Sequence, residues 1–306
     1  MLVDFVASQR HYLDHLRPLY QALPEDVRGH IGGGPPRNGA DLAVVASSAD
    51  MRRAVAWGGP VVLCEHGAGQ SYQGNHSSYA GGRGREQVVL FLCPNEAAAE
   101  RNRHAYPGVP ALAIGCPKLD AYHLSPAKPR GAPPVLALSF HWDCLVAPES
   151  RWAFPPYRNV LPGLASAYHV LGHGHPRVWP RLEEQYRNMR LEPVADFDEV
   201  MRRADLYICD NSSTLFEFAS TGRPVVVLNA PYYRREVNHG LRFWEAATVG
   251  IQCDDPHLLL QAVKQALADL PEQQAARQAA VSLAYAHTDG RAAERGAEAI
   301  LGLLKD

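Results

Sequence analysis

Residues 205–229, DLYICDNSSTLFEFASTGRPVVVLN, decide the expected fold. Their apolar beginning predicts a strand at Leu206–Cys209, and the helical spacing of the apolar residues that follow predicts a helix over 214–221. Backbone N–H groups and the positive end of the helix dipole meet at such a turn, so it can hold a phosphate or diphosphate. Thr214 and Glu217 also fit a capping box, and the turn would then be an ordinary helix start without a ligand.

The composition is that of a globular protein with room for more than one core. The chain has 306 residues, which suits two domains, and 46% of them are hydrophobic against 20% charged. The formal net charge of −2 gives no overall attraction to nucleic acid or to an anionic membrane, so charge leaves the partner class open.

The cysteines and the hydropathy pattern bear on the compartment. Six scattered cysteines without a C-x-x-C pair predict buried thiols in a reducing compartment. No stretch reaches 18 apolar residues, and the N-terminus lacks the apolar core of a signal peptide. We therefore expect a cytoplasmic protein with no transmembrane segment, and the oligomeric state stays open.

Short apolar strands alternate with longer helical stretches, which predicts an α/β fold with parallel sheets. A proline-rich break at 124–134 (LSPAKPRGAPP) divides the pattern into an acceptor-side domain, 1–125, and a nucleotide-donor-binding domain, 133–306, whose last helix is able to pack back on the first domain. The expected strands are 41–46, 60–65, 88–93, 111–115, 135–141, 167–172, 206–209 and 224–228. The expected helices are 3–23, 48–57, 95–104, 157–167, 178–189, 197–203, 214–221, 256–270 and 290–304.

A histidine follows the second of these strands. His66 lies among small residues in the run Cys64-Glu65-His66-Gly67-Ala68-Gly69-Gln70-Ser71. An imidazole titrates near neutrality, so His66 is a candidate for proton transfer, with Glu65, Gly67, Gln70 and Ser71 on the acceptor side. The alternative is a structural histidine.

Two histidines and an arginine follow the strand at 167–172. His173, His175 and Arg177 offer a cationic, hydrogen-bonding surface for a diphosphate. Asp210, Asn211, Ser212 and Ser213 follow another strand and join this donor-binding set together with Glu217. His173 and His175 could instead bind a metal, but no third ligand stands at the usual spacing, so no metal is predicted.

In their order along the chain, these clusters resemble the CDP-glycerol glycerophosphotransferase family of teichoic-acid and capsule-polymer synthesis. The matching positions are His66-Gly67, Gly115-x-Pro117-Lys118-x-Asp120, His175-Pro176, Asp205 to Ala219 with its Asp210-x-Ser212-Ser213 centre, Arg223-Pro224-Val225 and Asp289-Gly290-Arg291-Ala292. The resemblance implies a GT-B-like fold, in which two Rossmann-like domains face a central cleft. It also implies that His66 is the general base, that His175, Ser212 and Ser213 hold the diphosphate of the donor, and that Asp210 and Glu217 position the nucleotide.

Two stretches differ from the family pattern. Ala68-Gly69-Gln70-Ser71-Tyr72 replaces the family's Thr-Pro and nearby lysine, and Ser139-Phe140-His141-Trp142-Asp143 stands where the family has a Pro-Thr-Trp turn. No basic or amphipathic membrane-binding segment is evident at the N-terminus. Donor chemistry is therefore better defined than the acceptor, and a lipid-linked polymer is not favoured.

We expect a transferase that moves glycerophosphate or a related group from a nucleotide-diphosphate donor, such as CDP-glycerol, to a hydroxyl of a small or polymeric acceptor. The scheme requires no metal and no further cofactor, because histidines, an arginine and a helix dipole can offset the charge. Three alternatives stay open: a GT-B glycosyltransferase using a nucleotide sugar on a glycan or a modified nucleic acid; a nucleotide-sugar 2-epimerase, with Glu65 and Asp210 as its only candidate carboxylates; and a non-catalytic nucleotide-binding protein.

Overall fold

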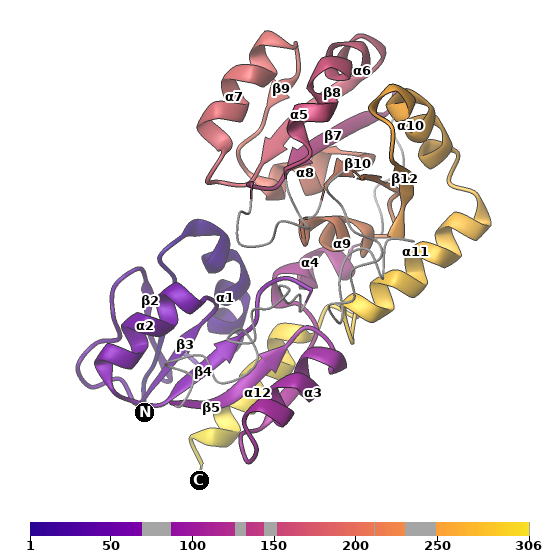
Figure 1. Ribbon diagram of the computed structural model, residues 1–306. Coiled ribbons are helices and arrows are strands. Elements are labelled where there is room, and N and C mark those ends of the chain that lie inside the picture. The colour runs from indigo at the N-terminus through magenta and orange to yellow at the C-terminus, as the bar shows by residue number, and fades with distance from the viewer. Residues whose placement is uncertain (69–86, 126–132, 144–151, 211, 230–248, 306) are drawn as a thin grey trace. The chain divides into compact units, whose positions relative to one another are not determined.

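The computed structural model describes residues 1–68, 87–125, 133–143, 152–210, 212–229 and 249–305. The chain forms two compact units, Met1–Ser125 with Ser282–Asp306, and Pro126–Val281. The C-terminal helix, yellow in Figure 1, lies with the purple elements of the first unit.

The first unit is built on a six-stranded parallel sheet. Its strand order is β2-β1-β3-β4-β5-β6. The strands are β1 (Val3–Val6), β2 (Arg28–Gly32), β3 (Leu42–Val45), β4 (Val61–Cys64), β5 (Val88–Cys93) and β6 (Ala111–Ala113). The helices are α1 (Arg10–Ala22), α2 (Ser48–Trp57), α3 (Glu96–Ala105), the 3₁₀ turn η2 (Pro117–Leu119), α4 (Asp120–His123) and α12 (Ala292–Leu303).

Both faces of this sheet are covered, which fits the sequences of β3, β4 and β5, since these strands are apolar at every position. In β3, Leu42 and Val44 pack in a cluster with residues of α1 and α12, whereas Ala43 and Val45 pack in a second cluster with residues of α2 and α3. Alternate side chains of a strand point to opposite faces, so a continuous apolar run is what a doubly covered strand needs. Each fully buried valine or leucine stabilises the fold by roughly 1.5–3 kcal/mol.

The predicted helix over 3–23 is wrong at its beginning. Val3–Val6 form β1 in the middle of the sheet, and only Arg10–Ala22 are helical. Four residues are too short a run to separate from the amphipathic pattern that follows. Asp4 inside this strand is buried, and its carboxylate accepts hydrogen bonds from Arg37 and from the backbone N–H of His30.

The second unit contains another six-stranded parallel sheet, with the order β12-β11-β10-β7-β8-β9. Its strands are β7 (Val135–Phe140), β8 (His169–Gly174), β9 (Glu192–Pro193), β10 (Leu206–Cys209), β11 (Val225–Leu228) and β12 (Ile251–Cys253). Its helices are α5 (Phe154–Tyr157), η4 (Arg158–Val160), α6 (Leu161–Ala167), α7 (Trp179–Asn188), α8 (Phe197–Arg203), α9 (Thr214–Ala219), η6 (Pro256–Leu258), α10 (Leu259–Ala268) and α11 (Pro271–Ala284), the last of which crosses the boundary between the units. Strands β2, β9 and β12 and helix α11 were not predicted.

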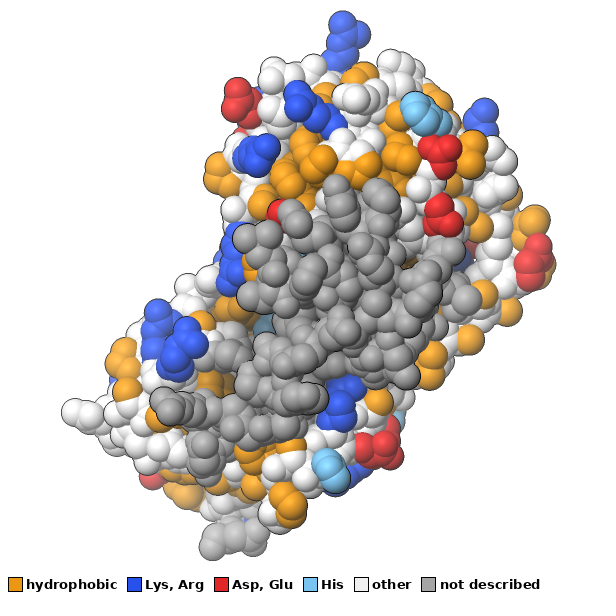
Figure 2. All heavy atoms as spheres, in the orientation of Figure 1, with side chains coloured by type: hydrophobic (Ala, Val, Ile, Leu, Met, Phe, Trp, Pro, Cys, Tyr) orange, Lys and Arg blue, Asp and Glu red, His pale blue; other side chains and the backbone are white. Residues whose placement is uncertain are grey.

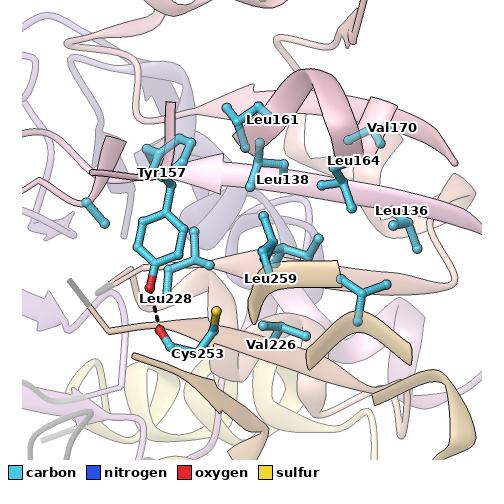
Figure 3. Close-up of a cluster of buried hydrophobic side chains, with 14 of the residues drawn as sticks. Leu136, Leu138, Tyr157, Leu161, Leu164, Val170, Val226, Leu228, Cys253 and Leu259 are labelled. Atoms are coloured by element: carbon cyan, nitrogen blue, oxygen red, sulfur yellow. Dashed lines mark hydrogen bonds between the residues drawn. The ribbon is translucent and has the colours of Figure 1, made fainter. Parts of the chain in front are cut away.

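The core on one face of this sheet is shown in Figure 3. Leu138 and Leu228 of the strands pack with Leu161 of α6 and Leu259 of α10. The hydroxyl of the buried Tyr157 donates a hydrogen bond to the carbonyl oxygen of Cys253, which ties α5 to the edge strand β12. The predicted fold class, two Rossmann-like parallel sheets with helices, is confirmed for both units.

The strand orders determine where a ligand site can form. In the second sheet, β7 lies between β10 and β8, so the chain leaves β7 toward one side of the sheet and continues from β10 toward the other. The order of the first sheet reverses in the same way between β1 and β3. Ligands of open parallel sheets bind outside the carboxyl ends of the strands at such a switch point.

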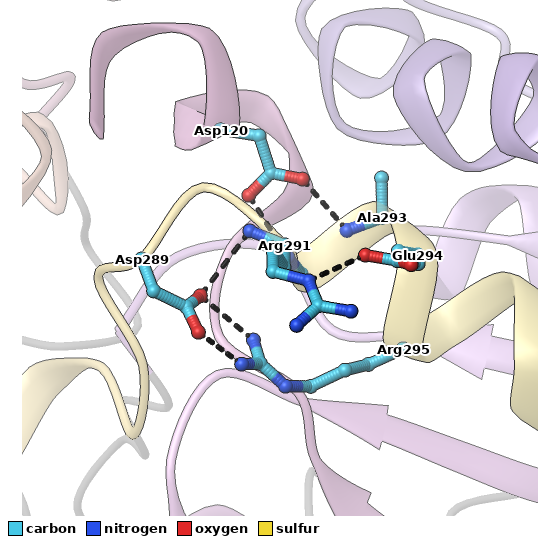
Figure 4. A network of polar contacts seen from close by, with 7 residues as sticks. Asp120, Asp289, Arg291, Ala293, Glu294 and Arg295 are labelled. Atoms are coloured by element: carbon cyan, nitrogen blue, oxygen red, sulfur yellow. Dashed lines mark hydrogen bonds and ion pairs between the residues drawn. The ribbon is translucent and has the colours of Figure 1, made fainter. Parts of the chain in front are cut away.

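Two of the family motifs meet in the first unit and hold its C-terminal helix. The carboxylate of Asp120 accepts the backbone N–H groups of Ala292 (3.0 Å) and Ala293 (2.7 Å) at the start of α12, as Figure 4 shows. Gly290 has φ +75°, and a Cβ there would lie 2.4 Å from Cγ of Leu124. Gly115, at φ +90°, would bring a Cβ to 2.8 Å from the carbonyl oxygen of His287. These positions therefore have a structural role.

Five cysteines lie in the described ranges, and all five are buried free thiols, as predicted. Burial raises the pKa of Cys64 to about 12 and that of Cys253 to about 11. Cys144 lies outside the described residues. Within the described ranges, no helix is both long enough and apolar enough to cross a membrane.

We predict that Asp4→Asn lowers the free energy of unfolding at neutral pH by about 1–3 kcal/mol, since it weakens charge-assisted hydrogen bonds. Burial by itself raises the pKa of Asp4, but the bonds from Arg37 and from the His30 and Arg37 backbones outweigh it, and the net pKa is lowered from 3.8. A lowered carboxyl pKa contributes stability that is present above about pH 4 and is lost as the pH falls through the folded pKa. Denaturant unfolding at several pH values should therefore show the variant and the wild type converging at low pH. The exposed Asp26→Asn is the control, and a pH-independent difference would contradict the assignment.

We predict that Asp120→Ala lowers the free energy of unfolding by about 1–2 kcal/mol, because two N–H groups of α12 lose their acceptor. Asp120→Asn keeps one acceptor oxygen and should lose less. Urea unfolding followed by circular dichroism measures both, with Asp26→Ala as the control. Equal stability of Asp120→Ala and the wild type would show that the helix does not depend on this cap.

Candidate functional site

In the first unit, His66 lies two residues after the end of β4 and contacts Ala46, the residue after β3. Its Nδ1 is 2.5 Å from the carbonyl oxygen of Ala46, and its side chain is exposed. A carbonyl oxygen can only accept, so Nδ1 carries the proton and the basic lone pair of the neutral ring lies on Nε2. The backbone therefore fixes His66 in the tautomer that a general base needs.

The ring of His66 is packed against α1. Tyr12 meets it edge-on with the ring centroids 4.9 Å apart, and the ring of His15 is 6.1 Å away. Burial, followed by the charges of Lys118 and His66, lowers the pKa of His15 well below its usual value. His15 therefore stays neutral, and it places no second positive charge beside His66 when His66 takes up a proton.

The predicted acceptor-side residues are only partly within the described ranges. Gly67 is buried and adopts φ +84°, a left-handed conformation that favours glycine. Glu65 is half-buried, and its Oε1 accepts a hydrogen bond from Nδ2 of Asn102 at 2.9 Å. Gln70 and Ser71 lie outside the described residues, so their role stays a prediction.

In the second unit, Asp210 joins the carboxyl ends of two central strands. It follows β10, and its buried Oδ1 accepts the backbone N–H of His141, the residue after β7, at 2.8 Å. Its Oδ2 accepts the N–H of Ala153 at 3.4 Å. The carboxylate thus positions the backbone at the switch point between β7 and β10.

His175 lies at the same edge, directly after β8. Its N–H donates to the carbonyl oxygen of Phe140, and its Nδ1 accepts the backbone N–H of Arg177 at 3.2 Å. A backbone N–H can only donate, so the proton of the neutral ring is on Nε2, which is then a hydrogen-bond donor. His175 thus has the tautomer opposite to that of His66.

Arg177 adds a positive charge beside this donor. Its guanidinium lies over the ring of Trp142, 4.5 Å from the centroid, and its side chain is exposed. The rings of Trp142 and His175 are 6.3 Å apart. Such a cation–π contact restricts the guanidinium while its N–H groups stay accessible to an anion.

His173 is placed differently from the prediction, which grouped it with His175 and Arg177 on one surface. It is buried, its Nδ1 is 2.9 Å from Oγ of Ser139, and its ring lies near those of Phe197 and Trp179. The reason is where the strand ends: His173 lies within β8 and is buried on one face of the sheet, whereas His175 follows the strand and is no longer held by its pleat.

The turn after β10 also differs in detail from the prediction. The capping box of Thr214 and Glu217 is not formed, because Ser213 is the residue before α9 and Oγ1 of Thr214 instead contacts Ser212 Oγ (2.9 Å) and the hydroxyl of Tyr207 (2.8 Å). Glu217 is buried within this six-residue helix. Ser212 and Ser213 are half-buried, and Asn211 lies outside the described residues.

His141 was not among the predicted site residues, although it follows the central strand of the sheet. Its ring centroid lies 5.0 Å from that of His175, edge to face. Burial lowers its pKa to about 4, although the hydrogen bond to Trp142 opposes the shift. The signal that could have found it is its place at the end of the predicted strand at 135–141, next to the strand that precedes His175.

An open cavity of about 410 Å³ in the second unit lies at the other end of the sheet. Val225 and Ile251, the first residues of β11 and β12, line it together with Arg277 of α11. Arg277 is already bound to Asp269 and to the carbonyl oxygen of Gly222. The cavity is therefore separate from the carboxyl edge of the strands.

Within the part of the chain that the structure describes, charged side chains of both signs are mixed on the face shown in Figure 2. Among the coloured side chains of Figure 2, blue and red groups are interspersed, and the face shown has no continuous basic surface. Within the same ranges, no cluster of three or more histidine, cysteine, aspartate or glutamate side chains could hold a metal ion.

The sequence matches one family. Residues 160–302 match the family described as CDP-glycerol:poly(glycerophosphate) glycerophosphotransferase, and this range includes His175, Ser212 and Ser213. No curated protein matches the chain.

Solved structures resemble the whole chain in fold. The wall teichoic acid polymerase TagF, soaked with CDPG, has a TM-score of 0.70 at 14% identity over 99% of this chain and 88% of its own. A putative UDP-N-acetylglucosamine 2-epimerase from Listeria monocytogenes has a TM-score of 0.65 at 15% identity, covering 99% and 96%. The UDP-GlcNAc 2-epimerase from Neisseria meningitidis has a TM-score of 0.65 at 14% identity, covering 100% of both chains.

At these identities the structural likeness shows the fold, which is of the GT-B type, and the family match supplies the class of reaction. The chain is therefore a transferase that is similar, over residues 160–302, to the CDP-glycerol:poly(glycerophosphate) glycerophosphotransferase family.

Proposed function

We propose that this protein transfers glycerophosphate from CDP-glycerol to a hydroxyl of an acceptor, with the donor diphosphate bound at the carboxyl edge of β7, β8 and β10. The observation that carries the proposal is the family match over residues 160–302, which contains His175 and the two serines after β10. The donor tautomer of His175 supports it, because Nε2–H can donate to a phosphate oxygen.

In the proposed reaction, the acceptor oxygen attacks the phosphorus that bears glycerol. A new bond forms between the acceptor oxygen and this phosphorus. The bond from this phosphorus to the oxygen that bridges the two phosphates breaks, and CMP leaves with the electron pair. His66 takes the acceptor proton on Nε2. Its Nδ1–H then stabilises the resulting positive charge through the carbonyl oxygen of Ala46.

On the donor side, we assign contact and positioning to different residues. His175, Arg177, Ser212 and Ser213 would contact the diphosphate, and the charge on the leaving CMP would be offset by Arg177 and by N–H donors. Asp210 and His173 would act through others, since Asp210 holds the backbone of His141 and His173 is bonded to Ser139.

The geometry disfavours the 2-epimerase alternative. Such an enzyme needs acid and base groups in its site, and Glu65 and Asp210 were the only candidate carboxylates. Glu65 is engaged by Asn102, and both oxygens of Asp210 accept backbone N–H groups. A nucleotide-sugar donor would use the same diphosphate contacts, so the experiment below includes such donors.

The acceptor is the less defined partner. We propose a polyol or sugar hydroxyl, small or polymeric, that binds beside His66 and Tyr12. The aromatic ring of Tyr12 lies edge-on to His66 and provides a surface against which a sugar or polyol carbon chain can pack.

We predict that CDP-glycerol raises the melting temperature of the protein more than CDP-ribitol or UDP-, GDP- and CDP-linked sugars do, because a ligand of the folded state stabilises it. At about 100 times its Kd, the gain is about 2.7 kcal/mol. His175→Ala should abolish the shift. His66→Ala should keep the shift and lower the rate at which CMP is released in the presence of an oligo(glycerol phosphate) acceptor by about 10²–10⁴-fold.

His104→Ala, on the exposed surface of α3, is the matched control and should change neither quantity. If a nucleotide sugar raises the melting temperature more than CDP-glycerol does, the donor is that nucleotide sugar and not CDP-glycerol. Full turnover in His66→Ala would remove His66 as the base.

A further inference from the structure

His141 is a half-buried histidine whose contacts all lie at the proposed donor edge. Its N–H donates to Oδ1 of Asp210, and its ring packs against those of Trp142 and His175. Its Nδ1 is 3.2 Å from the carbonyl oxygen of Trp142. The residue is therefore held on its backbone, on one ring nitrogen and by two neighbouring rings.

These contacts determine what the other ring nitrogen can do. The carbonyl oxygen of Trp142 only accepts, so Nδ1 carries the proton and Nε2 carries the lone pair. Protonation would put a second cation near the Arg177 guanidinium, and burial and that charge both hold the pKa of His141 down, at about 4. At neutral pH, Nε2 of His141 is thus a hydrogen-bond acceptor, and the described ranges supply it with no partner.

The neighbouring groups have the opposite character. Nε2–H of His175 and the guanidinium of Arg177 are donors that suit phosphate oxygens. A fully ionised diphosphate has only acceptor oxygens and cannot bond to Nε2 of His141. In CDP-glycerol, the groups that can donate to this nitrogen are the hydroxyls of the glycerol and the ribose and the amino group of the cytosine. The hydroxyls are the donors next to the diphosphate, and the ring of His141 is 5.0 Å from that of His175, so a hydroxyl fits this position.

We propose that His141 is a specificity-determining residue, which accepts a hydrogen bond from a hydroxyl of the nucleotide donor next to the diphosphate held by His175. The hydroxyl belongs either to the polyol that is transferred or to the ribose. The inference rests on the proposed function and adds to it a residue that recognises donors by hydroxyl content.

Isothermal titration tests the proposal with CDP-glycerol, with CDP-n-propanol, which lacks the polyol hydroxyls, and with the 2′,3′-dideoxy form of CDP-glycerol, which lacks the ribose hydroxyls. We expect His141→Phe to bind CDP-glycerol about tenfold more weakly, the usual effect of one lost hydrogen bond. His141→Gln retains an acceptor oxygen and should recover most of the affinity. The wild type should bind one of the two analogues about tenfold more weakly than it binds CDP-glycerol. For that analogue, His141→Phe should lower the affinity by less than twofold relative to the wild type.

The analogue whose affinity is not lowered by His141→Phe identifies the hydroxyl. CDP-n-propanol tests the hydroxyls of the polyol, and the dideoxy donor tests those of the ribose. A full effect of His141→Phe on both analogues, or no effect on CDP-glycerol, overturns the proposal while leaving CDP-glycerol as the donor. The wild-type measurements with the analogues keep the test valid if His141→Phe does not fold. Failure of the wild type to bind CDP-glycerol would overturn the proposed function, and this inference with it.

Discussion

The chemistry proposed for this protein depends on backbone groups at the carboxyl ends of parallel strands. They determine which nitrogen of each site histidine carries the proton. At the end of β3, the carbonyl oxygen of Ala46 keeps the proton of His66 on Nδ1. After β8, the N–H of Arg177 keeps the proton of His175 on Nε2. In the neutral rings, Nε2 of His66 can therefore take a proton, whereas Nε2 of His175 donates one in a hydrogen bond.

The family motifs thus contain two kinds of residue: candidate catalytic or ligand-binding residues, and structural residues that hold the backbone. His66 and His175 present ring nitrogens at strand ends, whereas Asp120 caps α12 and Asp210 holds the backbone after β7. Both aspartates lie in sequence motifs that include candidate site residues. Their contacts explain why the motifs contain carboxylates, since two backbone N–H groups need acceptors in each place.

Much of the fold could be predicted from the sequence, because buried parallel strands are continuous apolar runs. The strands Val88–Cys93 and Leu206–Cys209 and the helix Phe197–Arg203 have the predicted bounds. The strand Val3–Val6 was missed because its four residues merge with the helix pattern after it. The edge strands Glu192–Pro193 and Ile251–Cys253 are too short to give a periodic signal.

The site was predictable in position but less so in orientation. Strand ends identified His66 and His175, because any residue after a parallel strand lies at the ligand-binding edge. Strand register, which the sequence only partly reveals, turned His173 inward, and a local hydrogen bond made His141 an acceptor. Such contacts join residues that are adjacent in space through the backbone, and no sequence spacing encodes them.

The tautomers of His66 and His175 test the central claim most directly. Nitrogen-15 NMR of the ring nitrogens at neutral pH distinguishes a protonated from an unprotonated nitrogen, and His66→Gln and His175→Gln assign the signals. The account predicts a protonated Nδ1 in His66 and a protonated Nε2 in His175. The same tautomer in both rings would contradict it.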